Sequence, residues 1–236
     1  MRFVLLLSIL VALAGCQNSG QLSQWFSFGQ SAATEAGYGA QANAAGAVKD
    51  TLTSSAGIAT ALMGKSGSYD IPLPEQIQTL DSTLTKLGYG GTLDKMKTKM
   101  DSAASEAAAQ ATPVFQDAIK SMTLPDAIGL IGGGQTAVTD YFRSHTESQL
   151  AAKMAPIVQQ KLEATGFNSE YQTFLGIYNS LPLVNKPNLD IQSYVVDQTL
   201  DGLYNRMAQQ ETAIRADPKK AGSALVKQFF PAPAQN

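Results

Sequence analysis

Apolar side chains recur every three or four positions across residues 71–230, the spacing that places them on one face of an α-helix. The longest of these stripes covers residues 189–214 and ends before Asp217, whose successor Pro218 disfavours helical backbone. No segment alternates apolar and polar residues between hairpin turns, as a half-buried strand would. The sequence therefore predicts an all-α fold, a multi-helix bundle of six to eight helices.

Two prolines fall inside these stripes and predict breaks in them. Pro113 lies in an apolar pattern that continues to Met122, so we expect a kink there, or a new helix with Thr112 as its N-cap. Pro156 interrupts the stripe of residues 150–162 in the same way.

The first 15 residues predict a signal peptide. Arg2 supplies its positive charge, and the apolar run that follows is too short to cross a membrane as a helix. The run ends in "LAGC", which resembles the lipobox of bacterial lipoproteins, whose cysteine is acylated and becomes the first residue of the mature chain. We therefore expect fatty acyl chains such as palmitate on Cys16, the only cysteine, and two or three chains attach a protein stably to a membrane. By the same resemblance, Gln17 favours the outer membrane, with the protein facing the periplasm.

Acidic residues slightly outnumber basic ones. The chain has 17 Lys and Arg against 19 Asp and Glu, and removal of Arg2 with the signal peptide leaves a formal net charge of −3. Surfaces that bind nucleic acid or anionic lipid require clustered basic residues. We therefore expect no nucleic-acid partner, and membrane contact only through the lipid on Cys16.

Composition separates an N-terminal tether from the helical body. Across residues 27–68, 24 of 42 residues are Ala, Gly or Ser, which leaves little apolar surface to offset the entropy lost on folding. We therefore expect a flexible, lipid-anchored tether over residues 16–68, with at most one weak helix around residues 44–63. A single all-α domain is expected over residues 69–230, followed by a disordered tail over residues 231–236.

Residues 130–142, "LIGGGQTAVTDYF", place three consecutive glycines before a helical stripe. A phosphate-binding P-loop needs a lysine after its glycines and a strand before them, and this segment has neither. The preceding residues instead predict a short helix capped by Thr123, with Asp126 returning a hydrogen bond. We interpret the glycines as a helix–helix turn, and the start of the next helix as a weaker candidate for holding a carboxylate or another anion.

Five charged residues form the candidate site. Asp140 and Arg143 flank an aromatic pair, Asp201 interleaves with apolar residues, and Glu211 and Arg215 have the spacing of an intrahelical ion pair. We expect them to form one mixed-sign cluster between the two helices that carry them. The first interpretation is a set of ion pairs that fixes helix register, because charge inside proteins is usually paired. The alternative is a pocket that binds an anionic ligand through the two arginines.

Catalytic and metal-binding residues are not predicted. His145 is the only histidine, and the side chain of adjacent Ser144 is expected to point away from it, so the two form no nucleophile–base pair. The sequence has no Cys/His cluster, no HExxH motif and no acidic calcium loop. The sequence therefore favours a protein without metal, cofactor or enzymatic activity.

Four stretches of the sequence are similar to one known family and occur in the same order. They read "IPLPEQIQTL", "AIKSMTLPDAIGLIGGGQTAVTDYFRSHTESQL", "YVVDQTLDGLYNRMAQQETAIRADP" and "ALVKQFF". Together they resemble the bacterial envelope family catalogued as domain of unknown function 4197. The resemblance implies an exported, often lipidated, mostly helical protein with no assigned activity. The chain departs from the family at Gln135, where an acidic residue is usual, and in its Ala/Gly/Ser-rich N-terminal region.

The leading functional hypothesis is a lipid-anchored, periplasm-facing helical module with an interaction or structural role in the bacterial envelope. It predicts an envelope protein as partner. The alternative is the binding or carriage of a small anionic or amphipathic ligand at the polar cluster between helices. A third hypothesis is an envelope hydrolase that uses carboxylates brought together by the helices.

Overall fold

The structure is a computed structural model that describes residues 19–181 and 190–230, with side chains from residue 39 onward except that of Asp81. Regular structure in these residues is entirely helical, which confirms the predicted all-α class: eight α-helices, one short 3-10 helix and no strand. The helices are α1 (Ser19–Met63), α2 (Glu75–Lys86), α3 (Gly90–Ser121), α4 (Ala127–Ile131), α5 (Ala137–Ala164), α6 (Phe167–Ser180), α7 (Ile191–Ala216), η1 (Pro218–Ala221) and α8 (Ala224–Phe229).

Several sequence predictions concern residues that lie outside these ranges. They are the signal peptide, the acylation of Cys16 and the C-terminal tail, all of which stay predictions. Within the described ranges, no helix is both long and apolar enough to cross a bilayer.

Among the described residues, those from 19 to 42 and those from 43 onward belong to separate compact units. In the first unit, residues 19–42 are helical. The packed core belongs to the second unit, which contains the remaining part of α1 and all the other helices.

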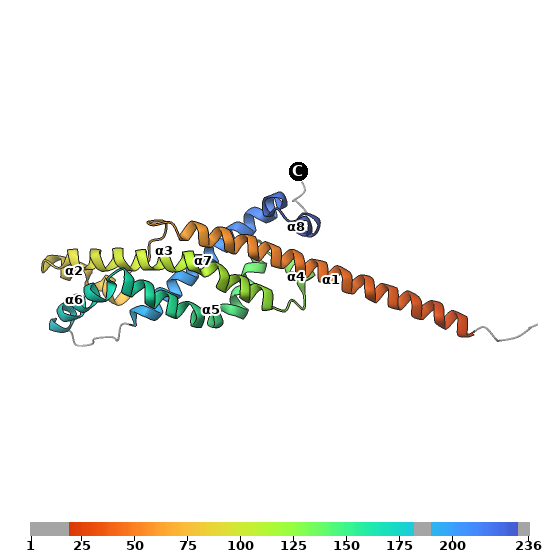
Figure 1. The fold of residues 1–236 in the computed structure, drawn as a ribbon, viewed down its shortest axis with the longest axis horizontal. Coiled ribbons are helices and arrows are strands. Elements are labelled where there is room, and N and C mark those ends of the chain that lie inside the picture. The colour runs from red at the N-terminus through yellow and green to blue at the C-terminus, as the bar shows by residue number, and fades with distance from the viewer. Residues whose placement is uncertain (1–18, 182–189, 231–236) are drawn as a thin grey trace, which may run out of the picture. The chain divides into compact units, whose positions relative to one another are not determined.

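Helices α3, α5 and α7 pack against one another and form the centre of the core (Figure 1). Phe115 of α3, Phe142 of α5 and Tyr204 of α7 are buried against one another, with ring centroids 5.9 to 6.1 Å apart. Helix α6 packs on α3 and α5, α2 packs on α3, and α4 packs on α5. The apolar stripes of the sequence are therefore helix faces that meet in a common core.

The Ala-rich second half of α1 belongs to the folded domain, which corrects both the predicted tether and the domain boundary at residue 69. Ala44, Val48, Leu52 and Met63 are all 0% exposed. Burial of these side chains shows that the folded domain begins near residue 43 and not at residue 69.

Helix α1 pairs with α3 in an antiparallel direction. The Lys49 ammonium donates to the carbonyl of Lys120 at 2.8 Å, and Thr60 Oγ1 lies 2.7 Å from Thr112 Oγ1. Buried alanines on both helices let the two backbones approach closely. This packing stabilises a helix that its composition alone would leave marginal, because most helical stability in proteins comes from tertiary contact.

Both internal prolines lie within continuous helices, which corrects the predicted new helix at Thr112 and the predicted interruption at Pro156. The alternative at Pro113, a kink, stays a prediction. Helix α3 runs through Pro113, so Thr112 is not an N-cap, and α5 runs through Pro156. A proline inside a helix leaves the carbonyl four residues earlier without its N–H donor. Here those carbonyls belong to Ala109 and Ala152, at exposed positions where water can supply the missing hydrogen bond.

Candidate functional site

The three glycines connect α4 to α5, in agreement with their interpretation as a helix–helix turn. Helix α4 ends at Ile131 and α5 begins at Ala137. None of these three glycines has a positive φ, so left-handed backbone does not explain them. Gly133 is needed for space, because a Cβ at this position would lie 2.7 Å from the Cβ of Ala137.

The N-cap of α4 is Asp126, which corrects the prediction of Thr123. The Asp126 carboxylate accepts a hydrogen bond from the amide of Gly129 at 2.8 Å. Gly129 leaves room for this cap, since an added Cβ would clash with the carboxylate. The carbonyl of Thr123 instead accepts a hydrogen bond from the Tyr141 hydroxyl at 3.2 Å, outside the helix.

A carboxylate from α7 occupies the start of α5. Glu211 is 0% exposed, and its two oxygens accept hydrogen bonds from the amides of Val138 and Thr139 at 3.0 and 2.7 Å. Amides in the first turn of a helix have no partner within the helix and carry partial positive charge. The sequence predicted that the start of this helix could hold a carboxylate or another anion. The Glu211 carboxylate of the same chain occupies that position.

Arg215 links Glu211 to the end of α4. Its Nε donates to Glu211 Oε1 at 2.9 Å, and its terminal nitrogens donate to the carbonyls of Ile131 and Leu130 at 2.7 and 3.0 Å. Carbonyls at a helix C-terminus lack intrahelical partners. The guanidinium also lies 5.0 Å from the ring centroid of Phe230. We call Glu211 and Arg215 the turn clamp, because this one ion pair satisfies both the end of α4 and the start of α5.

Arg143 belongs to a second group of charges. It pairs with Glu147 on α5, at 2.8 Å, and with Asp201 on α7. Burial lowers the pKa of Arg143, but the hydrogen bond to Glu147 and the charge of Asp201 raise it above its ordinary value. The guanidinium lies 5.2 Å from the ring centroid of Tyr204, whose pKa burial raises to about 12. We call Arg143, Glu147 and Asp201 the Arg143 bridge.

The five predicted residues therefore do not form one cluster. Asp201 of the Arg143 bridge and Glu211 of the turn clamp lie ten positions apart on α7, about 15 Å along the helix axis. Asp140 joins neither group, and its carboxylate accepts a hydrogen bond from Thr136 Oγ1 at 2.8 Å. Both ion-paired groups fit the interpretation that ion pairs fix the register of the helices, since each group connects α7 with α5.

Ser144 and His145 lie closer together than the sequence predicted. Ser144 Oγ is 3.0 Å from His145 Nδ1, and both groups also contact the carbonyl of Tyr141, at 2.9 and 2.8 Å. Because a carbonyl only accepts hydrogen bonds, Nδ1 carries its proton in this contact and is not available to accept one from Ser144. His145 also stacks on the Tyr141 ring, with centroids 4.0 Å apart. The geometry is that of an exposed helix surface and not of a nucleophile–base pair.

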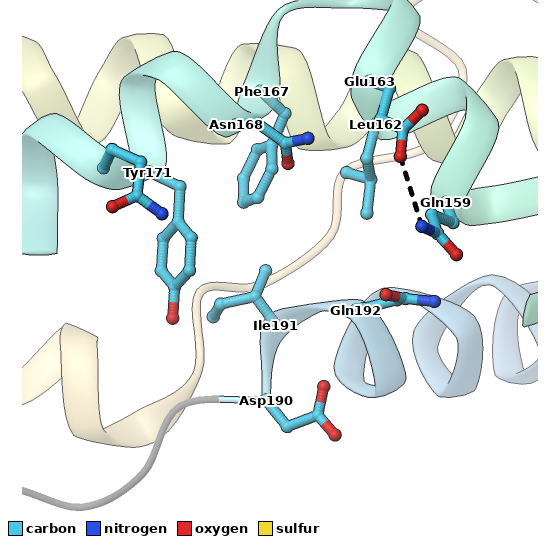
Figure 2. Close-up of a pocket in the computed structure, with 10 residues that line it drawn as sticks. Gln159, Leu162, Glu163, Phe167, Asn168, Tyr171, Asp190, Ile191 and Gln192 are labelled. Atoms are coloured by element: carbon cyan, nitrogen blue, oxygen red, sulfur yellow. Dashed lines mark hydrogen bonds between the residues drawn. The ribbon is translucent and has the colours of Figure 1, made fainter.

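A cleft of about 420 Å³ opens between the end of α5 and the starts of α6 and α7 (Figure 2). Leu162, Phe167 and Ile191, which are 4%, 2% and 3% exposed, form its apolar floor. Tyr171 of α6 extends toward α7 along one side of this floor. The polar rim consists of Gln159, Glu163, Asn168, Gln172, Asp190 and Gln192. We call this site the α6 cleft.

A smaller cleft of about 240 Å³ adjoins the α6 cleft across Gln192, which lines both. Its walls come from α5 and α7 and include Ala151 and Val196. Neither of these two clefts is lined by Arg143 or Arg215. In the part of the chain that the structure describes, no three His, Cys, Asp or Glu side chains are placed to hold a metal ion.

No pattern in the sequence singles out the residues of the α6 cleft. Phe167, Tyr171, Phe174 and Tyr178 follow helical spacing, and their rings stack in succession along α6, with centroids 5.5, 6.3 and 5.7 Å apart. The stripe indicates an apolar helix face, but not that Tyr171 borders a cleft, because the cleft depends on where α7 begins. The amides of the rim give no signal in one sequence, since exposed amides are common on helices.

One family matches most of the chain. A family model described as "Protein of unknown function (DUF4197)" matches residues 39–231, and so includes the Ala-rich half of α1 that packs in the core. The comparisons with curated proteins and with solved structures found no match.

Proposed function

Because the chain belongs to the DUF4197 family, we propose that it is a lipid-anchored helical module with an interaction or structural role in the bacterial envelope. The lipobox-like residues 13–16 support export and acylation at Cys16. Gln17 supports the outer membrane, with the protein facing the periplasm. Two or three acyl chains are enough for stable attachment, whereas a single chain binds only marginally.

The observation behind the proposed role is that the charged residues bind other groups of the same chain. The turn clamp and the Arg143 bridge bind partners on α4, α5 and α7, and Asp140 binds Thr136. Such ion pairs fix geometry even where they add little net stability. Because these charges hold the helices of the domain in register, they favour a rigid domain that presents its surface to a partner.

Exposed apolar side chains indicate where a protein partner should be sought. Leu87 and Tyr89, between α2 and α3, are 54% and 43% exposed, and Ile128 on α4 is 53% exposed. Isolated exposed apolar residues are common, so each position needs its own test.

The lipid anchor is tested by fractionating cells that produce the Cys16→Ser variant. Without the acylated cysteine, the protein should move from the membrane fraction to the soluble periplasmic fraction. Ser19→Ala, three residues away, is the matched control and should stay with the membrane. A Cys16→Ser protein that still fractionates with membranes would overturn the proposed anchor.

The interaction role is tested by photo-crosslinking in cells. A photoreactive amino acid replaces Leu87 or Ile128, and the same amino acid at the exposed Asp117 of α3 is the control. We expect a discrete protein adduct from at least one apolar position and none from residue 117. If both apolar positions give only the control pattern, and no envelope protein co-purifies in mild detergent, an interaction role is ruled out.

A further inference from the structure

We propose that the α6 cleft binds a short neutral glycan, an activity that goes beyond the interaction or structural role. The cleft combines a buried apolar floor, a tyrosine on one wall and a rim rich in amides. Its volume of about 420 Å³ lies in the range of small-molecule sites, and the neighbouring cleft leaves room for a second sugar ring beyond Gln192.

The floor suits the apolar face of a sugar ring. Phe167 and Tyr171 stack with centroids 5.5 Å apart and an angle of 17° between their rings, and Tyr171 stacks in turn on Phe174. Phe167 and Phe174 are buried, so the side chains on both sides of Tyr171 are held in place. The edge of a tyrosine ring held in this way can contact the C–H groups of a pyranose at little cost in side-chain entropy.

The rim suits sugar hydroxyl groups. Four of its six polar side chains are amides, and each amide both donates and accepts hydrogen bonds, as a hydroxyl group does. The carboxylates of Glu163 and Asp190 add acceptors of the stronger, charge-assisted kind. Figure 2 shows rim side chains on all three helices, with Glu163 on α5, Asn168 on α6 and Gln192 on α7.

The charges of the cleft argue against an anionic ligand. Among the described residues that line it, none is Lys, Arg or His. Lys161, the basic residue nearest in sequence on α5, instead pairs with Glu106 of α3 at 3.3 Å. An anion placed in the cleft would therefore meet two carboxylates, and none of the described lining residues would supply a compensating positive charge.

The carboxylates are also partly satisfied without a cation. Glu163 Oε1 accepts a hydrogen bond from Gln159 at 3.2 Å. Asp190 accepts hydrogen bonds from the amide and hydroxyl of Ser193, at 3.0 and 2.8 Å, at the positive end of α7. A neutral ligand with hydroxyl groups can use the remaining acceptor sites of these two carboxylates.

The proposal is tested by NMR on the ¹⁵N-labelled full chain, in a detergent without a sugar head group. The side-chain amide signals of Asn168, Gln172 and Gln192 should shift on titration with chitobiose or cellobiose, two neutral disaccharides. Spermidine and citrate are the cationic and anionic probes. No shift with either disaccharide, or larger shifts of the same signals with spermidine or citrate, would overturn the proposal.

Matched variants locate the binding. Asn168→Ala combined with Gln172→Ala removes two exposed amides of the rim, and we expect the dissociation constant to rise about tenfold or more. Ser169→Ala combined with Thr173→Ala changes the adjacent exposed positions on α6, outside the cleft, and should leave binding unchanged. Equal dissociation constants for the two double variants would place the glycan elsewhere and overturn the assignment of this cleft.

Discussion

The turn clamp and the Arg143 bridge both connect α7 with α5 through charged side chains, but they differ in exposure. In the clamp, the side chains of Glu211 and Arg215 are 0% and 14% exposed, whereas Arg143 and Asp201 are 37% and 36% exposed. The clamp also binds backbone groups at two helix ends, while the bridge joins side chains only. Sequence spacing identifies such pairs, but burial and backbone partners decide how much each contributes to stability.

The largest expected effect comes from Glu211→Ala. The substitution leaves the amides of Val138 and Thr139 and the Arg215 guanidinium without their buried acceptor, so the free energy of unfolding should fall by about 3–5 kcal/mol. Urea denaturation measures this loss. Added formate should restore part of the stability by binding the vacated site. Gln209→Ala, at an exposed position of α7, is the control, and a loss below about 1 kcal/mol for Glu211→Ala would contradict the special role of the clamp.

Arg215→Ala should lower the free energy of unfolding by about 2–3 kcal/mol, since it removes charge-assisted hydrogen bonds to Glu211 and to two carbonyls at the end of α4. The two clamp substitutions share partners, so the Glu211→Ala/Arg215→Ala double variant should lose less than the sum of the single losses. A double-mutant cycle in urea measures this coupling. Strictly additive losses would show that the two residues act independently.

Gly133→Ala tests the turn that the clamp holds. The added Cβ would lie 2.7 Å from the Cβ of Ala137, and we expect a loss of about 1–3 kcal/mol from overpacking. Gly134→Ala is the matched control, because a Cβ there meets no atom within 4 Å and the backbone needs no positive φ. Thermal unfolding of both variants checks the contrast, and equal melting temperatures would show that the turn can relax.

Arg143→Ala should cost only about 0.5–1 kcal/mol, the range of an exposed ion pair. The loss should shrink at high salt, because the paired groups are more than one-third exposed and their interaction is screened. Urea denaturation at low and high salt measures both effects. A loss as large as that of Glu211→Ala would remove the distinction between the bridge and the clamp.

The smallest expected effect concerns Asp197, which lies near the Arg143 bridge. Burial and the charges of Asp201 and Glu147 raise its pKa, so the folded state disfavours its ionised form. This cost is present above the folded-state pKa and disappears as the pH falls below the ordinary value of 3.8. Asp197→Asn should therefore raise the melting temperature slightly at neutral pH and not in acid.

Asp190 gives the opposite sign and serves as the comparison for Asp197. Hydrogen bonds from the backbone and side chain of Ser193 lower the pKa of Asp190, so its ionised form stabilises the folded state. This contribution is present above the ordinary pKa and is lost as the pH falls through the folded-state value. Asp190→Asn should lower the melting temperature at neutral pH, and a shift of the same sign for both variants would contradict these pKa directions.

The fold was predictable where helices carry wide apolar stripes, as α7 does. The second half of α1 was not, because alanines such as Ala44 and Ala47 contribute little apolar surface and become core residues only against the alanines of α3. The two internal prolines do not end their helices, for a related reason. Their effect depends on whether the carbonyl left without a donor faces water, which no pattern in one sequence reveals.

The sequence predicted which charged residues of the candidate site pair along a helix, but not which backbone groups they bind. The four-residue spacing identified Glu211 with Arg215, and the five charged residues were assigned to the right pair of helices. The sequence did not show that Glu211 reaches the amides of Val138 and Thr139, because that contact joins positions 73 and 72 residues apart. The α6 cleft was missed altogether, since it arises only where three helices end or begin together.

The separation between Glu211 and the start of α5 has a consequence for the order of folding. Val138 and Thr139 are synthesised 73 and 72 residues before the side chain that binds their amides, and such distant contacts require a long loop to close first. Helices α4 and α5 can therefore form early, but the corner between them cannot be completed before α7 docks. A chain truncated before residue 211 would keep the glycine turn and lose the carboxylate that holds it.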